Sequence, residues 1–198
     1  MQARYRLVAF DAYGTLCFIG NKLNPYGPVI AQSGLDYREA ASVLMTSTDS
    51  LVSLFDVDES LIQEVNAKVE EELASVCPFE ESIKTLQELK NRGVKVAVVS
   101  NLSPPYAAPL KELFSQYVDY FVFSFEVGHR KPDPKIFTEL MLVSGCRADE
   151  IMMVGDSIVS DVGGAKSVGI SSVLVKRKGN TQDGEVCTLD EINRYIFE

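Results

Sequence analysis

Five short, unbroken apolar runs are the feature that most restricts the folds open to this chain of 198 residues. They are rich in Val and Ile and do not alternate with polar residues, as expected of parallel strands covered on both faces. Stretches with helical spacing lie between them, which predicts an α/β sandwich with a mostly parallel sheet. The expected strands are residues 7–10, 94–99, 120–123, 151–154 and 172–175.

One long segment interrupts this alternation, between the first strand and a helix expected over residues 81–92. Residues 20–28 have the Gly, Asn and Pro content of a loop, and residues 36–75 carry apolar side chains at the spacing of two or three helices, with no clear strand. A structureless stretch of roughly 60 residues would be unusual in a compact domain. We therefore expect a small helical cap inserted over residues 17–78 and a core domain formed by residues 1–16 and 79–198.

The composition narrows the classes of function. Hydrophobic residues make up 46% and charged residues 24%, a balance typical of a globular protein with a sizeable core. A net charge of −9 argues against a broad nucleic-acid surface, which would be basic. No run approaches the ~20 apolar residues of a membrane span, and the first residues do not resemble a signal peptide, so we expect a cytoplasmic protein. The four cysteines are scattered, as is typical of reduced thiols.

Polar residues follow four of the expected strands, at the points where ligands bind to open parallel sheets. Because the carboxyl ends of parallel strands share one edge, we expect these side chains to gather at one rim. They are Asp11 and Thr15 after the first strand, Ser100 and Asn101 after the second, Lys131 after the third, and Asp156 and Asp161 after the fourth.

The carboxylates at this rim predict a metal site. Asp11 and Asp156, brought close together, would repel each other unless a cation lay between them. Oxygen ligands without a histidine cluster suit Mg²⁺, which also takes phosphate oxygens as ligands. A carboxylate at a strand end can attack phosphorus and form an aspartyl-phosphate, and Asp11 is the candidate for this role.

The remaining rim residues could bind the transferred group. Thr15, Ser100 and Asn101 can donate hydrogen bonds to phosphate oxygens, and Lys131 can stabilise the charge that builds up in the transition state. Several rim residues also have an ordinary structural interpretation: Ser100 and Asn101 could form a turn, Lys131 could simply be solvated, and Asp161 could cap a helix. The joint pattern of four strand ends, each with a fitting group, favours a catalytic site.

Four segments of this sequence resemble, in order, the four motifs of the haloacid dehalogenase superfamily. They are residues 10–16 (Phe-Asp-Ala-Tyr-Gly-Thr-Leu), Ser100-Asn101, residues 131–134 (Lys-Pro-Asp-Pro) and residues 155–165, which begin Gly-Asp-Ser. The resemblance implies a Rossmann-like three-layer sandwich with strand order 5-4-1-2-3 and a helical cap inserted after the first motif.

The same resemblance implies a role for each matching residue. Asp11 is expected to be the nucleophile, Thr15, Ser100 and Lys131 to contact the transferred group, and Asn101 to contact substrate. The expected Mg²⁺ ligands are Asp11, the backbone carbonyl of Tyr13, and Asp156, with Asp161 in or next to the metal shell. The partner implied is a small, phosphorylated molecule; the sequence does not indicate an oligomeric state.

Tyr13 departs from the pattern of the family's phosphatases, which carry a second Asp there as general acid. Tyrosine at this position is similar to the 2-haloacid dehalogenase branch, yet Gly155-Asp156 resembles the metal-binding version of the fourth motif. A cation would compete for the Asp11 carboxylate that a dehalogenase needs free, so Asp156 favours Mg²⁺-dependent phosphate ester hydrolysis. The alternatives are a metal-independent 2-haloacid dehalogenase, in which Arg38 could pair with a substrate carboxylate, and a weakly active metal-binding member of the family.

Overall fold

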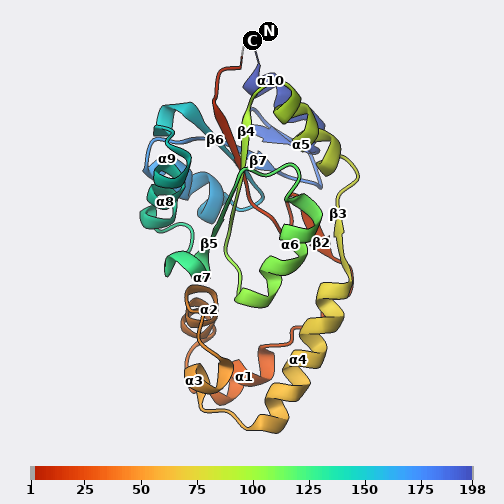
Figure 1. Ribbon diagram of the computed structural model, residues 1–198, viewed down its shortest axis with the longest axis vertical. Helices are drawn as coiled ribbons and strands as arrows, with labels where there is room; N and C mark the ends of the chain where they lie inside the picture. The colour runs from red at the N-terminus through yellow and green to blue at the C-terminus, as the bar shows by residue number, and fades with distance from the viewer. Residues whose placement is uncertain (1–2, 198) are drawn as a thin grey trace.

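A six-stranded parallel sheet forms the centre of the computed structural model, which describes residues 3–197 (Figure 1). The strand order is β5-β4-β1-β6-β7-β8. The first five are the strands expected from the sequence, and their order is the expected 5-4-1-2-3 counted from the opposite edge, so the fold prediction is confirmed. The strands are β1 (Leu7–Phe10), β4 (Lys95–Ser100), β5 (Tyr120–Phe123), β6 (Ile151–Gly155), β7 (Ser171–Val175) and β8 (Glu185–Val186).

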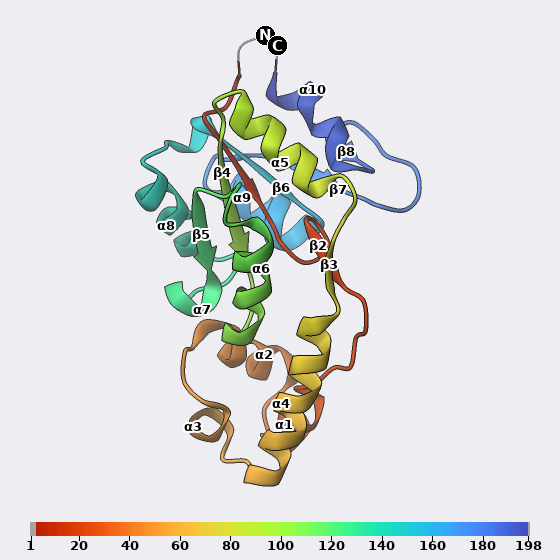
Figure 2. The ribbon, with the colours of Figure 1, turned by 45° about the vertical axis from the view of Figure 1, so that its right-hand side comes forward.

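Both faces of the sheet are covered by helices (Figures 1 and 2). In β1, Val8 and Phe10 pack in one apolar cluster, while Leu7 and Ala9 pack in the other, because successive side chains of a strand point to opposite faces. The first cluster includes residues of α5 (Ser82–Asn91), α6 (Ala107–Phe114) and α10 (Asn193–Ile196). The second includes residues of α8 (Pro134–Ser144) and α9 (Gly164–Ser167). Burial on both faces explains why the strands read as continuous apolar runs.

The inserted segment, residues 17–78, places four helices beyond the carboxyl ends of the strands (Figure 1). Its second helix starts where the sequence favours a start, because the Asp36 side chain accepts hydrogen bonds from the N–H groups of Arg38 and Glu39. The helices are α1 (Gly27–Gln32), α2 (Tyr37–Thr46), α3 (Leu51–Phe55) and α4 (Glu59–Ala74). The loop expected over residues 20–28 is shorter than predicted, because α1 already begins at Gly27.

The ends of the inserted segment pair with each other, which the sequence did not lead us to expect. β2 (Cys17–Ile19) and β3 (Val76–Pro78) form a separate antiparallel pair. Strands of three residues are too short to produce a recognisable apolar pattern. The division into a core and a cap at residues 17 and 78 stays a prediction, although β2 starts and β3 ends at those residues.

Short helical segments complete the described part of the chain. They are α7 (Ser124–Val127), the 3₁₀ segments Pro104–Tyr106, Ala148–Glu150 and Leu189–Ile192, and a π-helical turn at Ile158–Gly163. Among residues 3–197, no helix combines the length and apolar character that crossing a membrane requires.

Candidate active site

Three neighbouring strands bring the predicted site residues to one rim of the sheet. Phe10 of β1 pairs with Val98 of β4 on one side and with Val154 of β6 on the other. Asp11 therefore leaves β1 at the level where β4 and β6 end. Ser100 is the last residue of β4, and Asp156 follows β6 directly.

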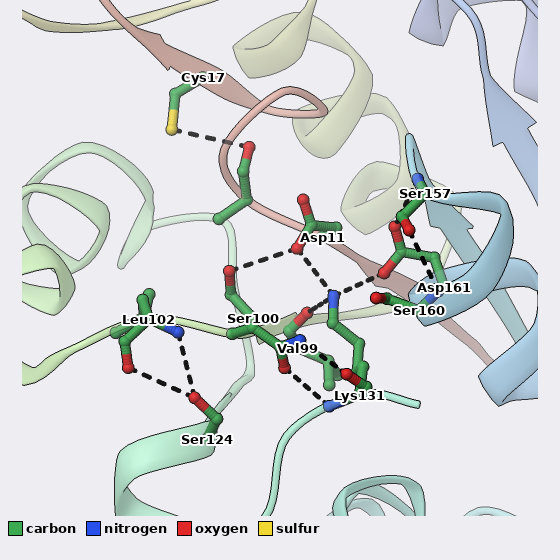
Figure 3. Close-up of polar contacts among 12 residues, drawn as sticks. Asp11, Cys17, Val99, Ser100, Leu102, Ser124, Lys131, Ser157, Ser160 and Asp161 are labelled. Atoms are coloured by element: carbon green, nitrogen blue, oxygen red, sulfur yellow. Dashed lines mark hydrogen bonds and ion pairs between the residues drawn. The ribbon is translucent and has the colours of Figure 1, made fainter. Parts of the chain in front are cut away.

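Lys131 lies at the centre of the hydrogen-bond network at this rim (Figure 3). Its Nζ donates to Asp11 Oδ1 at 2.7 Å, to Asp161 Oδ1 at 2.6 Å and to the Val99 carbonyl at 2.6 Å. Ser100 Oγ donates to the same Asp11 oxygen at 3.3 Å. Lys131 is buried, and its two carboxylate neighbours raise its pKa although burial alone would lower it. The side chain is therefore a fixed positive charge beside Asp11.

The three predicted carboxylates converge. One oxygen each of Asp11, Asp156 and Asp161 lies within 4.8 Å of the others. Burial raises the pKa of Asp11 to about 6, against the lowering effect of Lys131, and burial followed by the charge of Asp161 raises the pKa of Asp156. Three carboxylates beside one ammonium leave two uncompensated negative charges when all are ionised. An oxygen-only set with this excess charge fits a divalent cation such as Mg²⁺.

Two glycines make room for these carboxylates. A Cβ on Gly14, whose φ is +98°, would lie 2.2 Å from Asp156 Oδ2. A Cβ on Gly155 would lie 2.3 Å from Asp161 Cγ. A hydrogen bond within its own turn also fixes Asp161: its Oδ2 accepts from the Ser157 N–H at 2.9 Å. The close approach of Asp156 and Asp161 to the first strand therefore depends on the absence of side chains at both glycines.

Asn101 is bound to the backbone of Lys131. Its Oδ1 accepts from the Lys131 N–H at 2.7 Å, and its Nδ2 donates to the Lys131 carbonyl at 2.8 Å. These contacts join β4 to the loop that carries the lysine. The predicted contact of Asn101 with substrate stays a prediction; the structure adds a role in holding Lys131.

The side chains of Tyr13 and Thr15 are not part of the Lys131 network. The Tyr13 hydroxyl donates to the Tyr106 carbonyl at 2.9 Å, and burial raises the pKa of Tyr13 well above its usual range. Thr15 is fully buried, and its Oγ1 has no hydrogen-bond partner among residues 3–197. The predicted roles stay predictions: Tyr13 stands at the position of the general acid, and Thr15 is expected to contact the transferred group.

Arg177, which the sequence analysis did not select, holds the loop that follows the nucleophile. Its guanidinium donates to the carbonyls of Gly14 and Thr15, pairs with Glu81 Oε1 at 2.8 Å and stacks 3.3 Å from the centre of the Phe79 ring. Arg177 stands two residues after β7 ends. Extending the search for polar residues to the end of the fifth strand could have found it.

A cavity of about 470 Å³ adjoins the rim, between the sheet and the inserted helices. Tyr13 and Asn101 contribute to its wall from the core. Arg38, considered above as a partner for a substrate carboxylate, is exposed and is not among the lining residues.

Comparison with known proteins agrees with this geometry. The family model of haloacid dehalogenase-like hydrolases matches residues 5–169. Ribulose-1,5-bisphosphate 5-phosphatase of Halopiger xanaduensis is 39% identical over 46% of this chain and 39% of its own length. Glyceraldehyde 3-phosphate phosphatase of Methanothermobacter thermautotrophicus is 28% identical over 74% of this chain and 64% of its own length. The chain thus spans less than two thirds of each of these relatives.

Solved structures show the same architecture. A HAD phosphatase from Thermococcus onnurineus superposes with a TM-score of 0.65 at 26% identity, covering 98% of this chain and 97% of that one. A predicted phosphoglycolate phosphatase from Haemophilus somnus has a TM-score of 0.72 at 19% identity, over 97% and 98% of the two chains. L-2-haloacid dehalogenase from Xanthobacter autotrophicus has a TM-score of 0.67 at 20% identity, over 96% and 97%. The last two likenesses concern the fold alone. With its family model matched over residues 5–169, this chain belongs to the haloacid dehalogenase-like hydrolases.

Proposed function

We propose that the chain hydrolyses phosphate monoesters of small molecules, with Mg²⁺ as cofactor and Asp11 as nucleophile. The observation that carries the proposal is the convergence of Asp11, Asp156 and Asp161 within 4.8 Å around one buried lysine. Relatives named as phosphatases of small phosphorylated sugars support the choice of reaction. The net charge of −9 agrees with a small-molecule substrate rather than a nucleic acid, and we keep the cytoplasm as the proposed location.

The carboxylates of Asp11, Asp156 and Asp161, with the backbone carbonyl of Tyr13, would hold the cation. When bound, Mg²⁺ supplies charge neutralisation between these carboxylates and the phosphate oxygens. Ser100 and Lys131 already donate to Asp11 Oδ1, so both can orient the carboxylate and contact an incoming phosphate oxygen.

The proposed reaction has two displacements at phosphorus. In the first, a carboxylate oxygen of Asp11 bonds to phosphorus while the ester P–O bond breaks. The alcohol oxygen leaves with the electron pair and takes a proton from water, leaving hydroxide, because the Tyr13 hydroxyl already donates to the Tyr106 carbonyl. In the second, water bonds to phosphorus and loses a proton, which neutralises that hydroxide. The bond to Asp11 breaks, and inorganic phosphate and the free carboxylate result. Lys131 stabilises the negative charge in both transition states.

One experiment tests both parts of the proposal. Phosphate release from p-nitrophenyl phosphate should require Mg²⁺, stop in EDTA and disappear in Asp11→Asn, because an amide does not form the acyl-phosphate. Asp183→Asn, at an exposed loop position, is the matched control and should keep full activity. Full activity in excess EDTA would show that Mg²⁺ is not the cofactor. A beryllofluoride adduct on Asp161 in a crystal would show that Asp11 is not the nucleophile.

Tyr13 favours one alternative reaction, the dehalogenation of a 2-haloacid. In that reaction Asp11 would attack carbon and expel halide without a metal. Measuring halide release from 2-chloropropionate alongside phosphate release separates the two reactions. Halide release that is unaffected by EDTA would favour the dehalogenase.

A further inference from the structure

The cavity beside the carboxylate rim has a wall whose less exposed polar side chains already form hydrogen bonds within the protein. Core residues contribute Tyr13, Asn101 and Tyr106, and the inserted segment contributes Tyr26 and Glu72. The remaining wall is mostly aliphatic, with Ile19, Ile30, Ala41, Leu44, Met45 and Leu102 among its members.

Glu72 is the one carboxylate in this wall, and it is 4% exposed. Its Oε1 accepts from the N–H groups of Leu23 and Asn24 at 2.6 and 3.0 Å, and its Oε2 accepts from the Tyr106 hydroxyl. Three donors therefore use most of the roughly four acceptor positions of this carboxylate. Glu72 is also almost fully buried, so it offers a substrate hydroxyl little beyond the hydrogen bonds that it already makes.

The hydroxyls and amides nearest the rim are engaged in the same way. Tyr13 donates to the Tyr106 carbonyl, and the Asn101 amide pairs with the backbone of Lys131. Ser103 Oγ donates to the Tyr26 hydroxyl at 3.0 Å. The other polar side chains of the lining are those of Lys22, Asn24 and Tyr37, and all three residues are exposed. Away from this exposed side, the wall offers a ligand chiefly aromatic ring surface and aliphatic carbon.

The cavity is also well placed and large enough for the organic part of a phosphate ester. Tyr13 stands two residues after Asp11, and Asn101 follows Ser100, whose hydroxyl donates to Asp11. An apolar cavity of ~150 Å³ already holds a benzene ring, and the volume here is about 470 Å³. A ring attached to the phosphate through a short linker therefore fits.

We infer that this cavity binds an apolar, ring-bearing organic group, so that the substrates are phosphate esters of hydrophobic alcohols rather than of polyhydroxylated sugars. The inference rests on the proposed phosphatase function for its phosphate group. A polyhydroxylated group would lose its hydration in the cavity and find few free partners, whereas an apolar ring gains from leaving water. The specificity would thus differ from the sugar phosphates in the names of the relatives.

Binding of two inert phosphonates tests the cavity without requiring turnover. We would measure by calorimetry the Kd of 3-phenylpropylphosphonate and of 3,4-dihydroxybutylphosphonate, in the presence of Mg²⁺. The phenyl compound should bind about 10- to 100-fold more tightly, as expected for burial of one ring. Equal binding, or tighter binding of the diol, would overturn the inference.

Turnover of the corresponding esters separates this inference from the proposed function. 2-Phenylethyl phosphate and glycerol 3-phosphate both release primary alkoxides, so leaving-group reactivity does not decide between them. We expect kcat/KM to favour the phenyl ester by a similar factor. If glycerol 3-phosphate is cleaved as well as or better than the phenyl ester, the cavity inference fails while the phosphatase proposal stands. If p-nitrophenyl phosphate and both esters are inert, the phosphatase proposal fails and the phosphonate Kd ratio still decides the cavity.

Three variants locate the effect. Ala41→Phe fills the cavity and should abolish the preference between the two phosphonates, whereas Ala31→Phe, at an exposed position of α1 outside the lining, should preserve it. Met45→Gln places an amide in the wall at nearly constant volume and should shift the ratio of the two phosphonate Kd values towards the diol. This variant provides the test if Ala41→Phe does not fold. An unchanged ratio in Met45→Gln and in a folded Ala41→Phe would place the ring outside this cavity.

Discussion

The side-chain amide of Asn101 forms two hydrogen bonds with the backbone of Lys131, at 2.7 and 2.8 Å. Lys131 is the residue whose ammonium contacts Asp11, so the amide fixes the loop from which the ammonium reaches the nucleophile. We infer that Asn101 positions Lys131 in addition to any contact with substrate.

Asn101→Ala should therefore lower kcat about 10- to 100-fold with little change in KM, because small displacements of a charged group near the reacting atoms are costly. Steady-state kinetics on p-nitrophenyl phosphate measures both constants. Asn193→Ala is the matched control, since Asn193 also donates one side-chain hydrogen bond, to Glu88 at 3.4 Å, in another part of the core. A normal kcat in folded Asn101→Ala would show that Lys131 is held without it.

Gly14→Ala should abolish Mg²⁺ binding and activity, because its Cβ would occupy the position of Asp156 Oδ2, 2.2 Å away. The substitution also strains the backbone, at a φ of +98°. Gly179→Ala separates the two effects, since Gly179 has a φ of +87° and no atom within 4 Å of the added Cβ. Calorimetric titration with Mg²⁺ and thermal unfolding of both variants are the measurements. If Gly179→Ala also loses Mg²⁺ binding, backbone strain rather than the contact with Asp156 explains the loss in Gly14→Ala.

Tyr13→Phe should change kcat on an aryl phosphate by less than about 3-fold, because the hydroxyl is bound to the Tyr106 carbonyl and its raised pKa makes it a poor proton donor. Tyr13→Asp should raise kcat/KM on alkyl phosphates, whose alkoxides need a proton that a carboxylic acid can supply, an effect worth about 10²–10⁴ where a general acid acts. Steady-state rates on paired aryl and alkyl phosphates provide the readout. A large loss of activity in Tyr13→Phe would instead identify the phenol as the proton donor.

Glu81→Gln should destabilise the fold in a pH-dependent manner. Burial alone would raise the pKa of Glu81, but hydrogen bonds from Arg177 and from backbone N–H groups lower it below its usual value. A lowered pKa in the folded state means that the stabilisation is complete above the unfolded value of about 4.3 and is lost as the pH falls through the folded value. The difference from wild type, about 1 kcal/mol at pH 7, should therefore shrink below pH 4.

Urea unfolding of the Glu81 variant between pH 3.5 and 7 measures this difference. Glu80→Gln, at an exposed neighbouring position, should show no such dependence. A difference that stays constant over the whole range would mean that Glu81 acts through packing and not through its charge.

The sheet was predictable because its strands are buried on both faces and therefore read as continuous apolar runs. The rim was predictable for the same reason, since parallel strands place Asp11, Ser100 and Asp156 at one edge. The features that were not predicted are very short strands and contacts between residues far apart in the sequence. β2, β3 and β8 have two or three residues each, too few for a pattern.

Partners distant in the sequence were equally inaccessible from it. The bond of Tyr13 to the Tyr106 carbonyl joins two segments of the core that are far apart in the sequence. The bond of Glu72 to the Tyr106 hydroxyl depends on how the inserted helices lie over the sheet. No local pattern encodes that placement. Arg177 is the intermediate case: its position after a strand could be predicted, whereas its bonds to the Gly14 and Thr15 carbonyls could not.

The β2–β3 pair makes the inserted segment an exchangeable unit. Ile19 and Val76 are direct partners in the pair, and the Gly20 N–H donates to the Ser75 carbonyl at 3.0 Å, so the chain leaves and re-enters the core at adjacent points. With its ends already joined, such an excursion can grow or shrink at small entropic cost, since closure entropy depends only weakly on length. Residues 21–74 could therefore be replaced by another helical excursion of different length while β1, β4 and the Asp11–Lys131 contact keep their positions. This gives evolution, or a protein engineer, a route to new substrates that leaves the chemistry unchanged.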